Sequence, residues 1–162
     1  MKNINDVIIY SLKSSKEMLG ALTADLKGSE WTHRAVPGSN CTAWLVGHLI
    51  LTDRRALALA GVNDLPDLPE GFEKRFSRDP GCPEATSFGD TSILMPMFDQ
   101  HRDMLMRAIA ELPEPTFAEP MPKPHPRFGT KGEMFLFMGL HVIMHAGQIS
   151  TIRRSLGRPP LF

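Results

Sequence analysis

Cysteine is scarce in this chain of 162 residues, with Cys41 and Cys82 its only two. Small domains that depend on disulfides carry several cysteine pairs, so the composition does not indicate a disulfide framework. The first residues lack the apolar core of a signal peptide, and we find no apolar run approaching the roughly 18 residues of a membrane span. We therefore expect a cytoplasmic protein with no membrane partner.

An excess of charge of either sign is also lacking. Lys and Arg together number 18, as do Asp and Glu, so the formal net charge is zero. Proteins that bind nucleic acid present a basic patch or stripe, and neither this nor a recognition-helix pattern is visible. We expect a small-molecule partner and no nucleic acid. A chain of this length can bury a sizeable core as one domain, residues 1–162.

Apolar residues recur every three or four positions in four segments, which is the period of helices that face a core. The predicted helices span residues 4–27, 40–61, 92–112 and 131–156. No segment alternates with period two for long, which argues against strands. Proline-rich connections at 62–90 and 113–130 are long enough to cross the ends of a bundle. The pattern predicts an all-α four-helix bundle with long crossover loops.

Three histidines lie on apolar helical stripes. His141 and His145 are four residues apart, so their ring nitrogens can both reach one metal ion at about 2.1 Å. His48 lies on the stripe of another predicted helix. We interpret the three as a metal site in the bundle core, although packed core histidines remain an alternative. Gln148 shares the side of His145 and either orients one of the rings or is a partly exposed polar residue.

Two familiar metal motifs are absent from the predicted helices. His141-Val-Ile-Met-His145 lacks the glutamate that serves as base in the His-Glu-x-x-His motif of zinc proteases. No Glu-x-x-His motif lies within these helices, which argues against a di-iron carboxylate bundle. The predicted site is therefore mononuclear and rich in nitrogen. His101, on the apolar face of 92–112, is a candidate catalytic base, a fourth ligand that closes the site, or a packing residue.

Two stretches resemble the DinB-like superfamily. They are Trp44-Leu-Val-Gly-His48-Leu and His141-x-x-x-His145-Ala-Gly-Gln148-Ile, the latter followed by Leu156-Gly157-x-Pro159. The resemblance implies an up-down-down-up bundle in which His48, His141 and His145 hold a divalent metal ion, zinc or nickel. It also implies a homodimer. The better-understood members imply transferase or isomerase chemistry with a low-molecular-weight thiol as cosubstrate.

The first functional hypothesis is an enzyme whose metal activates a thiol or a water as nucleophile, with hydrolysis open beside transfer and isomerisation. The alternative is a non-catalytic metal- or small-molecule-binding bundle, connected with stress. A metal-free bundle of packed histidines is a third possibility. Arg55 is either an anchor for an anionic substrate group or a surface residue. Cys41 is a candidate reactive thiol, and the loop histidines His33 and His125 receive no role.

Overall fold

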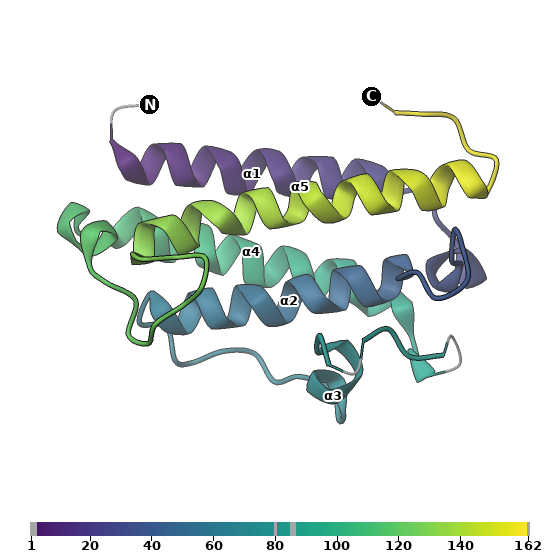
Figure 1. The fold of residues 1–162 in the computed structure, drawn as a ribbon, viewed down its shortest axis with the longest axis horizontal. Coiled ribbons are helices and arrows are strands. Elements are labelled where there is room, and N and C mark those ends of the chain that lie inside the picture. Colours follow the sequence, from purple (N-terminus) through teal and green to yellow (C-terminus); the bar gives the residue numbers. More distant parts are fainter. Residues whose placement is uncertain (1–2, 80, 85–86, 162) are drawn as a thin grey trace.

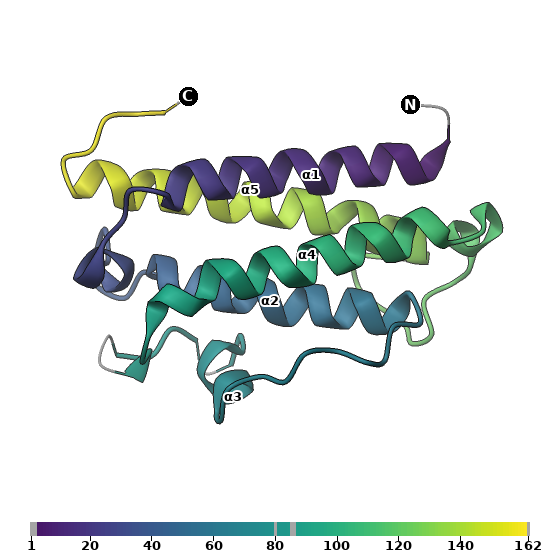
Figure 2. The same ribbon diagram turned by 180° about the vertical axis from the view of Figure 1, so that it is seen from behind.

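Four long helices form the structure, a computed structural model that describes residues 3–79, 81–84 and 87–161 (Figure 1). They are α1 (Ile4–Thr23), α2 (Thr42–Leu59), α4 (Leu94–Glu111) and α5 (Lys131–Ser155). Figures 1 and 2 show α1 and α5 running in one direction and α2 and α4 in the other. The all-helical bundle and its up-down-down-up order are therefore confirmed.

The order of the helices around the bundle differs from their order in the chain. α1 packs against α4 and α5, and α2 packs against the same two helices. α1 and α2 therefore lie diagonally opposite each other, as do α4 and α5. Of the two proline-rich connections expected to cross the ends of the bundle, the described part of 62–90 instead runs back along its length, because it joins α2 to α4, which run in the same direction (Figure 1). The connections 24–41 and 112–130 do cross the ends. They contain the short 3-10 helices η1 (Gly28–Thr32) and η4 (Glu114–Ala118).

The connection between α2 and α4 contains a short helix that the sequence pattern did not reveal. This helix, α3 (Phe72–Phe76), is followed by the 3-10 turn η3 (Thr91–Ile93). The rings of Phe72 and Phe76 are buried against α2. A Cβ at Gly47 of α2 would overlap the ring of Phe76. Glycine at position 47 therefore lets α3 approach α2 closely.

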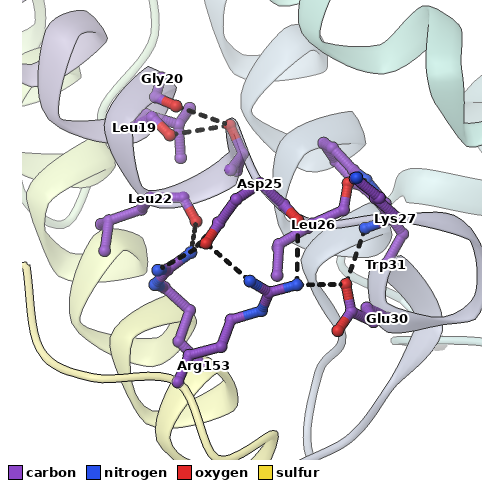
Figure 3. Close-up of polar contacts among 11 residues, drawn as sticks. Leu19, Gly20, Leu22, Asp25, Leu26, Lys27, Glu30, Trp31 and Arg153 are labelled. Carbon is purple, nitrogen blue, oxygen red and sulfur yellow. Dashed lines mark hydrogen bonds and ion pairs between the residues drawn. The ribbon is translucent and has the colours of Figure 1, made fainter.

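α1 ends at Thr23, four residues earlier than predicted, because the chain turns there into a cluster of charged groups (Figure 3). Arg153, near the end of α5, donates to the carbonyl of Leu22 at 2.9 Å and pairs with Asp25. Arg158 pairs with Asp25 and with Glu30, each at 2.7 Å. The neighbouring guanidinium of Arg153 lowers the pKa of Asp25. The cluster fastens the end of α5 to the turn after α1.

A fully buried ion pair lies at the centre of the bundle. Arg102 of α4 donates to both carboxylate oxygens of Asp53 on α2, at 2.8 and 2.9 Å. The same guanidinium donates to the Ser15 hydroxyl on α1 at 3.4 Å and to the Met138 carbonyl on α5. Both charged side chains are 0% exposed. This one side chain therefore links all four long helices.

α5 is more apolar than the sequence analysis recognised. It is long and apolar enough to span a membrane by length and composition, with a mean hydropathy of 1.3 over its most apolar window. The expectation that no run approaches that length is therefore wrong. Half of this window is buried inside the bundle.

Candidate metal centre

The three predicted histidines converge between α2 and α5. His48 comes from α2, and His141 and His145 come from adjacent turns of α5. One ring nitrogen from each lies within 4.8 Å of the others, and the Nε2 atoms of His141 and His145 are 2.9 Å apart. A tetrahedral ion with nitrogen ligands at about 2.1 Å holds them roughly 3.4 Å apart. Small side-chain rotations would therefore bring the cluster to that geometry.

Hydrogen bonds fix the orientation of two of the rings. Nδ1 of His145 lies 2.8 Å from Oε1 of Gln148, whose side chain is exposed, so the contact is compatible with both interpretations of Gln148. Nδ1 of His48 lies 3.3 Å from the carbonyl of Phe76 in α3. Each ring that donates through Nδ1 presents an unprotonated Nε2, the form that binds metal. Nδ1 of His141 is buried without a hydrogen-bond partner among the described residues.

The environment favours the neutral form of all three imidazoles. Burial lowers the pKa of His48 to about 4 and that of His141 to about 3, with the neighbouring histidines adding to the effect. Burial also lowers the pKa of His145. Neutral imidazole is the ligand form, and three converging neutral rings fit one divalent ion. The donor set is entirely nitrogen, which suits zinc or nickel more than magnesium or calcium.

The cluster opens into a cleft of about 1340 Å³ between α2, α5 and the crossing connections. Trp44, stacked on His48 with ring centroids 4.9 Å apart, forms part of its wall. The segment 121–128 of the proline-rich crossing also lines the cleft. A bridge between Pro120 and Thr130 closes the base of this loop. The crossing connection 112–130 therefore forms part of the wall of the cleft.

Aromatic rings connect the loop to the histidines. His125 stacks on Phe128 with centroids 4.4 Å apart, Phe128 contacts Phe137 at 4.9 Å, and Phe137 contacts His141 at 5.5 Å. His125, to which the sequence analysis gave no role, therefore lies on the wall of the cleft. This row of rings packs the loop against the histidine cluster.

The charged residues on the cleft wall are all basic. They are Arg55 of α2, Arg78 of the segment after α3, and Lys123 and Arg127 of the crossing loop. All four are exposed. Arg55, Arg78 and Lys123 form no hydrogen bond or ion pair with the described part of the chain. The chain as a whole has no net charge, whereas the cleft wall formed by the described residues carries a positive charge.

His101 is buried but lies outside the histidine cluster. Its Nδ1 is 2.7 Å from the carbonyl of Met97, and its Nε2 is 3.0 Å from Arg54. Both ring nitrogens are therefore engaged within the bundle, and the structure does not bring His101 to the ligands. His33 lies at the far end of α5, where its Nε2 is 2.9 Å from the hydroxyl of Ser155.

The sequence analysis missed the carbonyl of Phe76, together with Arg78, Lys123 and Arg127. A main-chain acceptor has no side-chain signature. A signal for the basic residues is nevertheless present, because no Asp or Glu occurs between Glu119 and Glu133 while Lys123, Arg127 and Lys131 do. Arg55 was a candidate, and its place on the wall agrees with that hypothesis.

An up-down-down-up four-helix bundle in which the buried His141 and His145 and the half-buried His48 face an open cleft defines a class of helical protein equipped for one divalent metal ion. Within that class, the model of the DinB superfamily matches residues 11–149. The chain belongs to this superfamily of metal-binding helical proteins, and the resemblance noted in the sequence is confirmed. No match to the chain was found among curated proteins.

Proposed function

We propose that the protein is a mononuclear metal-dependent enzyme in which His48, His141 and His145 hold zinc or nickel. The observation that supports this most is the convergence of three neutral ring nitrogens at the floor of an open cleft. A divalent ion in such a site lowers the pKa of a bound thiol or water towards neutrality. The superfamily favours thiol-dependent transfer or isomerisation over hydrolysis.

The side chains around the ligands set what the site accepts. Gln148 and the Phe76 carbonyl keep two imidazoles in fixed orientations, which maintains the ligand geometry. Trp44 and Phe137 provide apolar faces beside the ligands, suited to the carbon skeleton of a substrate. Among the described residues, no fourth His, Cys, Asp or Glu joins the cluster. This supports a site with an open position over the closed structural site of the non-catalytic alternative.

The substrate or thiol is a small anion. Among the described residues, four basic side chains and no carboxylate line the cleft, and a wall with charge of one sign concentrates ligands of the opposite sign. Arg55 and Arg78 lie near enough to His48 to lower its pKa, and Arg127 does the same to His141. An anionic group held by these residues would place the rest of a small molecule beside the ligands.

The test of this function uses zinc-loaded and nickel-loaded protein with a panel of anionic thiols and an alkyl or aryl halide as acceptor. Metal-dependent thiol consumption is expected, and the double variant Arg55→Gln/Arg78→Gln should raise KM for the thiol. Arg154→Gln, at an exposed position on α5 away from the cleft lining, is the matched control. Equal KM values for both variants would contradict the anion site, and no turnover with any thiol would favour the binding-protein alternative.

We also propose a cytoplasmic homodimer. α5 exposes Leu136, Leu140 and Ile143, which are 39%, 55% and 40% exposed and follow each other at helical spacing. A second copy covering this stripe would remove these apolar side chains from water. Sedimentation analysis of the wild type and of Leu140→Lys tests the assembly, with a dimer expected for the first and a monomer for the second. A wild-type monomer would contradict it.

A further inference from the structure

The only two cysteines of the chain, distant in sequence, lie side by side. Cys41 is the residue before α2, and Cys82 belongs to the connection between α3 and η3. Their Sγ atoms are 3.7 Å apart across a sequence separation of 41 residues. Nothing in the proposed metal chemistry uses either thiol, since neither belongs to the histidine cluster.

Arg34 holds the two segments together. Its guanidinium donates to the carbonyl of Ser39, just before Cys41, and to the carbonyls of Cys82 and Pro83 at 3.3 and 2.5 Å. The approach of the thiols is therefore built into the packing of the connection against the start of α2. A positive charge beside the pair also favours a thiolate there.

The two thiols differ in access and in acidity. Cys41 is 0% exposed, whereas Cys82 is half-buried. The hydrogen bond between the two thiols, with the nearby Arg34, lowers the pKa of Cys82 to about 6. The same contact and burial raise the pKa of Cys41. Such an asymmetry is typical of a pair in which one cysteine attacks and the other resolves.

We propose that Cys41 and Cys82 form a redox-active dithiol that a low-molecular-weight disulfide oxidises to an intramolecular disulfide. The Cys82 thiolate attacks one sulfur of the small disulfide, forming a mixed disulfide and releasing one thiolate. Cys41 then loses its proton to the released thiolate and attacks Sγ of Cys82. The Cys41–Cys82 bond forms, and the second small thiolate leaves and takes a proton. Two electrons thus pass from the protein thiols to the small disulfide, which becomes two thiols.

The Cys41–Cys82 disulfide would lie beside the rim of the cleft. Asn40 and Gly81, the chain neighbours of the two cysteines, both line it. A covalent bond between their positions would fasten the segment that carries Arg78 to the start of α2. Because the bond closes a long loop, the oxidised protein should also be harder to unfold than the reduced protein.

The experiment equilibrates the full chain with oxidised glutathione in the presence of a chelator, so that bound metal plays no part. The wild type should lose both free thiols in Ellman's assay, lose two hydrogens in its intact mass, and yield a peptide joining positions 41 and 82. It should melt at a higher temperature than the reduced form. Cys41→Ser should stop at a stable glutathione adduct on Cys82, and Cys82→Ser should retain an unmodified Cys41.

Several results would overturn the proposal. Two free thiols in the wild type under conditions that modify Cys41→Ser would show a packed pair without exchange. Disulfides only between chains, or equal modification of the two single variants, would contradict the assigned attack and resolution. Circular dichroism of each variant checks that it is folded. Because the wild type alone decides whether the bond forms, a variant that fails to fold leaves the main test intact.

Discussion

The buried pair of Arg102 and Asp53 offers a quantitative test of how the bundle is held together. Replacing Arg102 with methionine keeps an apolar side chain of similar length but leaves the Asp53 carboxylate without its bidentate partner. Both side chains are 0% exposed, so water cannot take the place of the guanidinium. Removing one partner of a buried pair costs about 3–5 kcal/mol of unfolding free energy, a large part of the roughly 5–15 kcal/mol typical of a domain.

The assay is thermal unfolding followed by circular dichroism. A chain of this size loses about 2–4 °C per kcal/mol, so the midpoint should fall by about 6–20 °C in Arg102→Met. The double variant Arg102→Met/Asp53→Leu should recover most of the loss, because it removes the unpaired charge as well. Arg154→Met, at an exposed position, is the control. A midpoint for Arg102→Met equal to that of the control would refute the reasoning.

Three further predictions concern the histidines. Gln148→Leu should weaken zinc binding about 10–100-fold in a calorimetric titration, because it removes the acceptor that orients His145; unchanged affinity would contradict that role. Gly47→Ala should lower both the melting midpoint and the zinc affinity, because the new methyl displaces Phe76, whose carbonyl contacts His48; a fully folded variant with normal affinity would contradict it. The metal-free protein should lose stability to urea as pH falls from 6.5 towards 4, because unfolded histidines bind protons in this window while the folded His48, with a pKa of about 4, does not. Stability that is constant or rises on acidification in that window would contradict this sign.

The helices were predictable because their apolar period is long and regular. α4 and α5 begin and end within about two residues of the predicted bounds, as is usual for helix termini. α3 was missed because five residues are too few to display a period. The early end of α1 depends on Asp25 meeting Arg153, a contact across the bundle that no local pattern contains.

The histidine cluster was predictable in part. The spacing of His141 and His145 places both rings on one face whatever the tertiary structure, whereas the approach of His48 depends on the register between α2 and α5. The apolar stripe on which His101 lies predicts that its side chain is buried. It does not predict which groups contact its ring nitrogens, which in the structure are Arg54 and the carbonyl of Met97. The contact of Cys41 with Cys82 could not be predicted, because Cys82 lies in a connection whose sequence has no periodic pattern of apolar residues.

Elemental analysis of untagged protein beside His48→Ala and His33→Ala tests the central claim most directly. His33 is half-buried, lies outside the histidine cluster and contacts Ser155 at the far end of α5. The His33→Ala variant therefore also loses one imidazole but leaves the proposed site intact. The account predicts about one zinc or nickel ion per chain in the wild type and in His33→Ala, and its loss in His48→Ala. A wild type that binds neither metal after incubation with both, or a His48→Ala variant that keeps its ion, would contradict the three-histidine centre.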